Sequence, residues 1–522
     1  MVIYRRTAAV LVLALSACSA TVPPAQAPVP APSAAIPAVT GAAASPAAAA
    51  ALITPGSVRA HVDFLASDEL RGRDTPSPGL ERAAEYLVDR LRALGLRPAG
   101  DSDSFIQRFP LEDVRMDVAG LRVEARHHGT LTRAVFGDDV FVLPSAVDSV
   151  VGIPVFAGMA RPGFMPQGDV TGRIVVVFVP DTMSQAWQVA VSSSLQAAHG
   201  GGAAAVILVL DPAFSAARIG QLANDLDSNV GPLPVIGMRY EVARGVFQHA
   251  GLDLAAIRHR TEGAPTELQG VTMLLRTPIS TSSAMVPNVV AVLEGSDPAR
   301  RNEYVVYSAH FDHVGAGSPD ATGDSIYNGA DDNASGTSAV LEAARAFAAL
   351  QSRPARSVMF VLVSGEEKGL LGSMYFVQNP PVPVLQMVAN INADMVGRNA
   401  PDTIVAIGQD YSSLGATAQS VAGRHPEIGL LVAPDLWPQE QLFFRSDHFS
   451  FAAQEVPAIF FTSGLHEDYH RPSDQAHLLD HDKVSRVSRL MFYLGHEIAT
   501  AAERPQWTPE GLEAVRRATG GR

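Results

Sequence analysis

Acidic and histidine side chains follow apolar runs at several places between residues 304 and 395, and one more histidine lies at residue 470. Imidazole nitrogens and carboxylate oxygens are the ligands that zinc takes in two-metal hydrolase sites, and a spare carboxylate can serve as the base. The sequence therefore predicts a two-zinc hydrolase site assembled from distant parts of the chain. The motifs are Ser308-Ala-His-Phe-Asp-His313, Gly329-Ala-Asp-Asp-Asn333, Ser364-Gly-Glu-Glu-Lys368, Asn392-Ala-Asp-Met395 and Tyr469-His470.

No single motif is sufficient to establish a metal site. His310 follows an apolar run, and Asp312 is spaced to hold its second ring nitrogen, as metal-bound imidazoles require, but a hydrogen-bonded core histidine fits equally well. Asp331 and Asp332 precede a predicted helix, whose N-terminus attracts carboxylates, so helix capping is the alternative interpretation. Two adjacent aspartates exceed what a cap needs, and we expect Asp332 to bridge two cations.

Glu366 and Glu367 follow a run of apolar residues. Adjacent carboxylates in such a place repel each other unless a cation or a proton intervenes. In the functional interpretation Glu367 is a metal ligand and Glu366 accepts a proton from the attacking water. The alternative is a solvated turn in which Lys368 neutralises one of them. Asp394, after the next apolar run, is either a ligand or a loop-capping carboxylate.

Tyr469 and His470 complete the set of candidates. His470 is the last potential ligand, and Tyr469 is either a packing residue or a donor to the developing oxyanion. Two histidines and three carboxylates together form a ligand set that nothing else in the chain rivals.

The apolar runs around these motifs predict strands that are buried on both faces of a sheet. Helical patterns lie between them, which indicates an α/β fold with a doubly wound, mostly parallel sheet. Ligands gather at the carboxyl ends of the strands in such sheets, and His310, Glu366, Glu367 and Asp394 fall there. The expected strands are 288–293, 304–308, 358–363, 388–391, 403–407 and 458–461, and the expected helices are 337–350, 412–423 and 483–502.

The preceding half of the chain adds two predicted helices, Ser57–Leu65 with Ser57 as its N-cap and Leu80–Leu94. Residues 130–265 are β-rich, with a short helix expected at 194–199. This region lacks a His/Asp/Glu constellation. Its runs resemble the protease-associated domain, which is often inserted in secreted peptidases; they are Gly172-Arg-Ile-Val-Val-Val, Gly202-Ala-Ala-Ala-Val-Ile and Leu233-Pro-Val-Ile.

The order of the chemical motifs resembles that of the zinc aminopeptidases and glutamate carboxypeptidase-like enzymes, which are co-catalytic metallopeptidases. That order is His-x-Asp, an Asp within Gly-Ala-Asp-Asp-x-x-Ser-Gly, Glu-Glu, Asp-Met and a final His, and every step is present. The resemblance covers Ser57 to Pro505 and implies the zinc exopeptidase fold with an inserted protease-associated domain. The expected divisions are a signal peptide (1–18), a tether (19–52), the first part of the peptidase domain (53–130), the inserted domain (131–266), the main part of the peptidase domain (267–505) and a tail (506–522).

The resemblance also implies roles. Two Zn²⁺ ions are expected, one held by His310 and Asp394, the other by Glu367 and His470, with Asp332 bridging them.

Asp312 is expected to orient His310, Glu366 to act as general base, and a cis peptide bond to follow Asp332. His448, in the family-like Ser446-Asp-His loop, is a candidate pocket residue. Arg398 and Arg445 are candidates for binding a substrate carboxylate.

The predicted function is that of a zinc-dependent exopeptidase, and specifically an aminopeptidase, that hydrolyses peptides through a water shared by two metals. Two alternatives stay open. A glutaminyl cyclase-like acyltransferase shares the fold, but as a family it uses one zinc and lacks the histidine that matches His310. The second alternative is a non-catalytic binding protein on the same fold, but such proteins usually lose metal-ligand residues.

The N-terminus predicts export. Arg5 and Arg6 precede a short apolar run, and Leu15-Ser-Ala-Cys18 resembles the lipobox of bacterial lipoproteins, in which the cysteine is lipidated. Cys18 is the only cysteine, so an intramolecular disulfide is excluded. Residues 19–52, rich in Ala and Pro, are expected to tether the protein to a membrane, most simply the outer membrane, as a periplasmic or envelope lipoprotein. A net charge of −14 argues against nucleic acid as a partner.

Overall fold

The computed structural model describes residues 43, 45–116, 120–135, 139–143, 149–161, 168–180, 185–214, 233–277 and 279–519. Cys18 and the expected signal peptide lie outside these residues. Within the described part of the chain, no helix has the length and apolar character that a membrane crossing demands.

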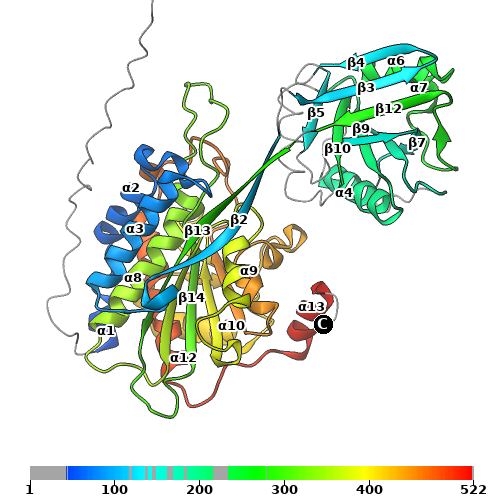
Figure 1. Cartoon of the computed structure of the whole chain (residues 1–522). Coiled ribbons are helices and arrows are strands. Elements are labelled where there is room, and N and C mark those ends of the chain that lie inside the picture. The colour runs from blue at the N-terminus through cyan, green and yellow to red at the C-terminus, as the bar shows by residue number, and fades with distance from the viewer. Residues whose placement is uncertain are drawn as a thin grey trace, which may run out of the picture. The chain divides into compact units, whose positions relative to one another are not determined.

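A nine-stranded sheet forms the centre of the region that carries the chemical motifs (Figure 1). Its path is β1-β13-β15-β14-β16-β19-β17-β18, and β2 pairs with β13 outside that path. The central strands β15, β14, β16 and β19 are parallel to one another, whereas β13 and β17 flank them in antiparallel orientation. The α/β fold with a mostly parallel central sheet is therefore confirmed. The strands are β1 Arg97–Pro98, β2 Ile106–Met116, β13 Ile279–Leu293, β14 Tyr304–His310, β15 Ser357–Val363, β16 Met387–Ala393, β17 Thr403–Ile407, β18 Leu431–Ala433 and β19 Ala458–Thr462.

The central strands are apolar throughout because each face of the sheet is covered. In β15, Phe360 belongs to one apolar core and the next residue, Val361, to another, since successive side chains of a strand point to opposite faces. Every residue of β14, β15 and β16 is buried. Removing a large apolar side chain of this kind from water contributes about 1.5–3 kcal/mol.

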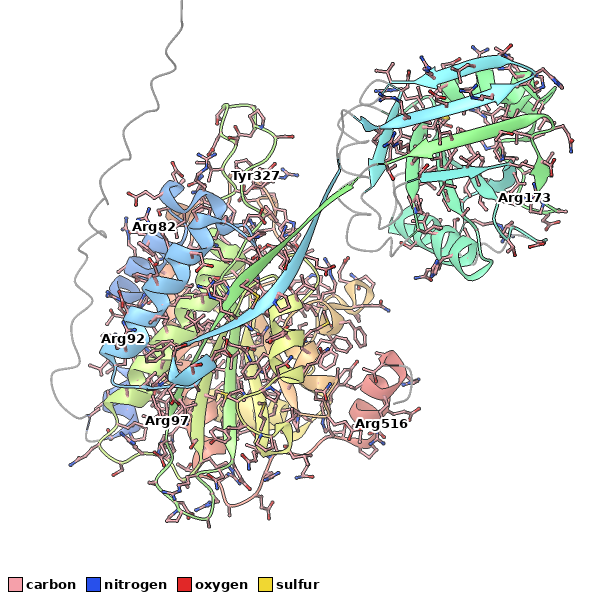
Figure 2. All side chains as sticks on the ribbon, in the orientation of Figure 1. Arg82, Arg92, Arg97, Arg173, Tyr327 and Arg516 are labelled. Carbon is pink, nitrogen blue, oxygen red and sulfur yellow. The ribbon has the colours of Figure 1, made fainter. Side chains whose placement is uncertain are left out.

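Helices α2, α3, α8 and α12 contribute to the core on one face of the sheet, and α9 and α11 to the core on the other (Figure 1). The outer side of α3 is charged: Arg82 and Arg92 lie at the surface and pair with Glu69 and Asp89 (Figure 2). The helices are α1 Pro46–Ala50, α2 Pro55–Leu65, α3 Pro78–Ala93, α8 Gly336–Ala349, α9 Leu371–Gln378, α10 Ser413–Arg424, α11 His448–Ala452, α12 His481–Thr500 and α13 Pro509–Ala518.

The start of α2 differs from the prediction. Thr54, not Ser57, is the N-cap, and Ser57 occupies the third helical position, where the two side chains form a reciprocal capping box. Pro55 at the first position explains the earlier start, because its fixed φ suits the first turn.

The end of the expected tether is folded where the structure describes it. Ala43 bridges Leu350, and α1 buries Ala49 and Ala50 against the core. The small side chains of this stretch permit close packing. Because a run of alanines also resembles a linker, the composition alone did not reveal that the stretch is structured.

Residues 122–276 form two further sheets around apolar cores of their own. The six-stranded sheet has the order β11-β7-β8-β9-β10-β5, with β7 to β10 parallel, and the four-stranded sheet has the order β4-β3-β12-β6. Helix α4 is longer than the predicted 194–199. The elements are β3 Arg122–His127, β4 Thr130–Ala134, β5 Val140–Leu143, β6 Ser149–Gly152, β7 Pro154–Met159, β8 Ile174–Val179, α4 Gln185–Gly200, β9 Ala205–Leu210, β10 Val235–Arg239, α6 Tyr240–His249, α7 Leu254–Ile257, β11 Thr266–Glu267 and β12 Val271–Arg276.

Candidate metal centre

The carboxyl ends of the four central parallel strands bring the sequence motifs together. His310 is the last residue of β14, the Glu366–Glu367 pair follows β15, and Asp394 follows β16 directly. The segment before α8 supplies Asp332, and the loop after β19 supplies His470. The expected convergence at this edge of the sheet occurs because parallel strands end on the same side.

One cluster is centred on His310, which is buried. Its Nε2 atom lies 3.3 Å from Oδ1 of Asp394, 3.4 Å from Oδ1 of Asp332 and 4.0 Å from Oε2 of Glu366. Asp394 Oδ1 forms no hydrogen bond of good geometry with any residue that the structure describes, although it is near His310 Nε2. An imidazole nitrogen that faces three carboxylates in this way is arranged as a metal ligand would be.

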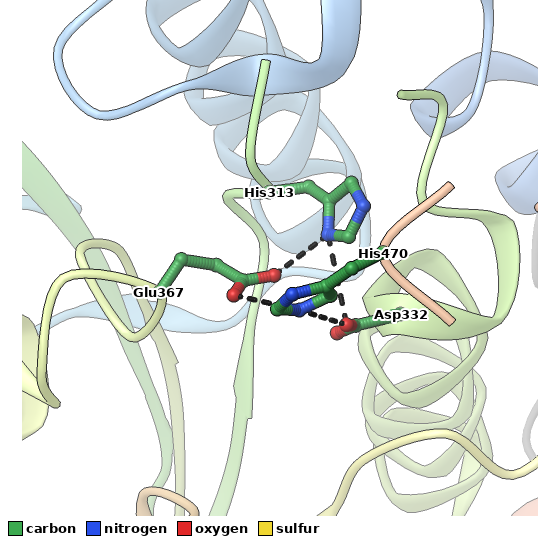
Figure 3. A group of neighbouring side chains, drawn as sticks. All are labelled: His313, Asp332, Glu367 and His470. Atoms are coloured by element: carbon green, nitrogen blue, oxygen red, sulfur yellow. Dashed lines mark hydrogen bonds and ion pairs between the residues drawn. The ribbon is translucent and has the colours of Figure 1, made fainter. Parts of the chain in front are cut away.

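A second cluster consists of His313, Asp332, Glu367 and His470 (Figure 3). His470 Nε2 lies 3.1 Å from Oδ2 of Asp332 and 3.0 Å from Oε2 of Glu367. His313 Nδ1 lies 2.7 Å from Oε1 of Glu367 and 3.7 Å from Oδ2 of Asp332. The sequence interpretation overlooked His313, although it lies within the same motif as His310.

Asp332 joins the two clusters, because its Oδ1 faces His310 and its Oδ2 faces His470. The peptide bond between Asp332 and Asn333 is cis, as the family resemblance implies. The buried carboxylate of Asp474 accepts hydrogen bonds from the backbone N–H groups of Asp331 and Asp332 and fixes this turn. Asp474 carries no sequence signal that distinguishes it from a surface aspartate.

The ionisable groups have strongly shifted pKa values. Burial raises the pKa of Glu366 well above its usual range, and Glu367 and Asp394 add to this effect. Burial would also raise the pKa of Glu367, but His470 and His313 outweigh it and hold it well below its usual range. Adjacent carboxyls with opposite shifts are typical of acid–base sites.

The pKa values of His310 and His470 are raised, although burial alone would lower them. Burial lowers the pKa of His310, but Asp394 and Glu366 outweigh it and hold the pKa well above its usual value. The pKa of His470 is raised to about 11, because Glu367 and Asp332 outweigh burial. Without a cation, the His470 imidazole therefore holds a proton that balances part of the carboxylate charge.

Asp312 lies behind His310. Its carboxylate Oδ1 is 3.7 Å from His310 Nδ1, and its backbone oxygen is closer, at 3.3 Å. The same carboxylate accepts hydrogen bonds from the Thr75 hydroxyl and from the N–H groups of Gly365 and Glu366. Asp312 therefore positions the Glu366 loop as well as facing His310.

Arg73 is a second buried support that sequence reasoning missed. Its guanidinium donates to the backbone oxygens of Phe311, Asn328 and Gly329, and so ties the loop after β14 to the turn before Asp332. Arginine is usually a surface residue, so nothing in the sequence marks this one as buried.

The donor set fits zinc. Imidazole nitrogens and carboxylate oxygens mixed in this way are ligands that zinc accepts. Asp394 Oδ1 and His470 Nε2 are buried and form no hydrogen bond among the described residues, so each is a ligand-type atom left for an ion to satisfy.

A pocket of about 520 Å³, including its open mouth, lies over the clusters. Asp332, Glu366, Glu367 and Asp394 form its polar part. Its remaining lining combines apolar side chains with Tyr469 and one cation: Met395, Leu442, Arg445, Phe460, Thr462, Gly464, Leu465 and Tyr469.

Two candidate substrate residues do not line this pocket. His448 is fully buried, with its ring stacked on Phe460. Arg398 pairs with Asp468 at 2.7 Å. The Ser446–His448 loop instead supports the site from behind, because the Ser446 hydroxyl donates to Oδ2 of Asp394.

Residues 288–495 match the sequence model of "Peptidase family M28". A "Probable zinc metalloprotease" of Pyricularia oryzae is 28% identical over 280 residues, which are 45% of this chain and 53% of the relative. A "Probable leucine aminopeptidase" of Arthroderma otae is 27% identical over 41% of this chain and 58% of its own length. The chain thus spans little more than half the length of these curated relatives.

Solved structures share the fold. An aminopeptidase from Aneurinibacillus sp. strain AM-1 superimposes with a TM-score of 0.58 at 17% identity, covering 88% of this chain and 97% of the other. This likeness confirms the zinc exopeptidase fold. At such low identity it extends no further than the fold.

Proposed function

We propose that this chain, whose residues 288–495 match the model of peptidase family M28, is a zinc-dependent exopeptidase that acts as an aminopeptidase. The observation that carries the proposal is the sharing of one carboxylate, Asp332, between two clusters of ligand atoms on the floor of a pocket. Glu366 lies in the same pocket with its carboxyl group 4.0 Å from His310.

Two Zn²⁺ ions are the proposed cofactors. His310 and Asp394 would hold one ion, Glu367 and His470 the other, and Asp332 both. The two oxygens of Asp332 face different histidines, which is the arrangement that a bridging carboxylate needs.

Glu366 is the proposed general base and acid. When bound, paired zinc ions make water a stronger acid and polarise a carbonyl group. Glu366 then accepts the proton of the attacking water and delivers it to the leaving amine nitrogen. Its backbone N–H donates to Asp312, which holds the main chain from which the carboxyl group extends.

Tyr469 is the proposed donor to the oxyanion that develops on the substrate carbonyl. Its ring stacks on that of His470, and it lines the pocket. Burial and the nearby carboxylates of Asp332 and Glu367 raise its pKa well above its usual value, so its hydroxyl keeps the proton that it would donate.

The apolar wall of the pocket suits a peptide whose first residue has an apolar side chain. Met395, Leu442, Phe460 and Leu465 provide that surface next to the carboxylates. The relative that is named a leucine aminopeptidase supports the same substrate class.

The test is Glu366→Gln, with Glu467→Gln, an exposed residue of the His470 loop, as matched control. Glu366→Gln should keep two zinc ions per chain by elemental analysis. It should lower the kcat for leucine p-nitroanilide by about 10²- to 10⁴-fold, the usual contribution of a general base. Glu467→Gln should match the wild type. Substantial turnover by Glu366→Gln would refute the base assignment. A single zinc together with cyclisation of glutaminyl peptides would favour the cyclase-like alternative.

We also propose export with lipidation at Cys18, on the lipobox-like sequence alone. Expression of the full chain with Cys18→Ser should move the protein from the membrane fraction to the soluble periplasmic fraction. An unchanged distribution would refute the anchor and leave the peptidase proposal intact.

A further inference from the structure

His313 is the histidine of the metal centre that neither the family order nor the proposed mechanism uses. It is fully buried, three residues after His310, and its backbone N–H donates to the backbone oxygen of Arg73. Its Nδ1 atom faces Glu367 and Asp332, while its Nε2 atom has no hydrogen-bond partner among the described residues.

The ring of His313 is held in place. Gly329 has a φ of +58°, and a Cβ atom there would come within 2.5 Å of the His313 ring. On another side Glu367 lies 2.7 Å from Nδ1, and the ring of His470 packs edge-on at 5.5 Å. A ring fixed in this way offers its nitrogen without further loss of side-chain freedom.

The spacing of the four side chains fits one ion, because one ligand atom from each lies within 4.8 Å of the other three. Neighbouring ligands of a tetrahedral zinc site lie roughly 3.4 Å apart when each bond is about 2.1 Å long. Across His313, Glu367, His470 and Asp332, the nearest contacts range from 2.7 Å (His313–Glu367) to 3.7 Å (His313–Asp332). The two contacts of His470, at 3.0 and 3.1 Å, lie between these values.

We propose that His313 is a fourth protein ligand of the metal ion held by Glu367, His470 and Asp332. That position would then have four protein ligands, one more than the position held by His310, Asp394 and Asp332. This inference rests on the proposed two-zinc centre.

An isosteric pair of variants separates a ligand from a hydrogen-bond donor. In His313→Asp, a carboxylate oxygen takes the place of Nδ1 and can bind the ion, but it repels Glu367. In His313→Asn, the amide can still donate to Glu367 but is a poor zinc ligand. A ligand role predicts that Asp retains tight binding of this ion and Asn does not; a donor role predicts the reverse order.

The readouts are zinc affinity, by competition with a chromophoric chelator, and the ¹H NMR spectrum of the full chain loaded with one Co²⁺ per molecule. Loss of a partner that merely orients a ligand costs about 10- to 100-fold in metal affinity, and His313→Asn should exceed that loss at one of the two sites. The wild type should show two exchangeable, strongly shifted imidazole protons at the tighter site, and His313→Asn only one.

Equal affinity in the wild type and both variants, or one shifted imidazole proton in the wild type, would overturn the role of His313. A wild-type chain that binds no divalent ion would instead overturn the proposed function, so the two failures differ. A variant that fails to fold is recognised by circular dichroism, and the proton count in the wild type then decides alone.

Discussion

The carboxylate of Asp312 accepts a hydrogen bond from the backbone N–H of Glu366, at 3.3 Å. The loop after β14 is thereby joined to the loop after β15, so a residue expected to orient only His310 also holds the proposed base. Neighbouring parallel strands bring the two loops together, which sequence spacing cannot reveal.

Asp312→Asn should impair both neighbours. The amide keeps the shape of the carboxylate but replaces one acceptor with a donor that faces N–H or O–H groups. We expect kcat/KM to fall about 10- to 100-fold, the usual effect of removing a group that orients metal ligands. Thr75→Val, which removes only the hydroxyl donor to Asp312, should cost less. Equal losses in the two variants would contradict this division of roles.

Zinc binding near pH 7 should release protons. In the metal-free protein the pKa of His470 is about 11, because Glu367 and Asp332 outweigh burial, and burial raises that of Glu366 well above its usual value. His470 is therefore protonated at pH 7 in the metal-free protein, and a ligating imidazole must lose its proton. Titration calorimetry in buffers of different ionisation enthalpy measures the release. Apparent zinc affinity should consequently fall as the pH is lowered, and a pH-independent affinity would contradict the assignment of His470 as ligand.

Arg445 should favour substrates that carry a free C-terminal carboxylate. It lines the pocket and forms a long ion pair with Glu440, at 3.7 Å. Arg398 does not line the pocket and pairs with Asp468 at 2.7 Å. A charge-assisted hydrogen bond contributes about 1.5–3 kcal/mol, or roughly 10- to 100-fold in rate. Arg445→Met should therefore lower kcat/KM for Leu-Gly but leave Leu-Gly-amide unchanged. A parallel loss on both substrates would indicate a structural role instead.

His448 should make the protein less stable in acid. Burial lowers its pKa to about 3, so between that pH and about 6.5 the unfolded chain binds a proton that the folded chain excludes. Stability should fall by up to about 1.4 kcal/mol per pH unit as the pH drops below 6.5. His448→Phe removes the titrating group where the native ring stacks on Phe460. Urea unfolding of metal-depleted protein at pH 7 and pH 5 should show a smaller pH dependence in the variant. Identical slopes would refute the assignment.

Much of the fold was predictable because apolar periodicity reports burial directly. The runs at 304–308 and 358–363 were extended by a few residues in β14 and β15, and their fully apolar character correctly indicated helices on both faces. The start of α2 was not predictable, since Thr54 and Ser57 are equally good capping residues and Pro55 decided between them. The folding of α1 was missed because a run of alanines resembles a linker until its neighbours are known.

The sequence by itself determined which strand ends carry ligand-type side chains, and so it determined that His310, Asp332, Glu367, Asp394 and His470 would meet. Only the tertiary structure decided which way the loop side chains point. It turned His313 into the cluster, left Arg398 outside the pocket, and placed Asp474 beneath the turn at Asp332. The physical reason is that a parallel sheet fixes where each strand ends, whereas the loop that follows has no repeating backbone geometry from which a side-chain direction can be inferred.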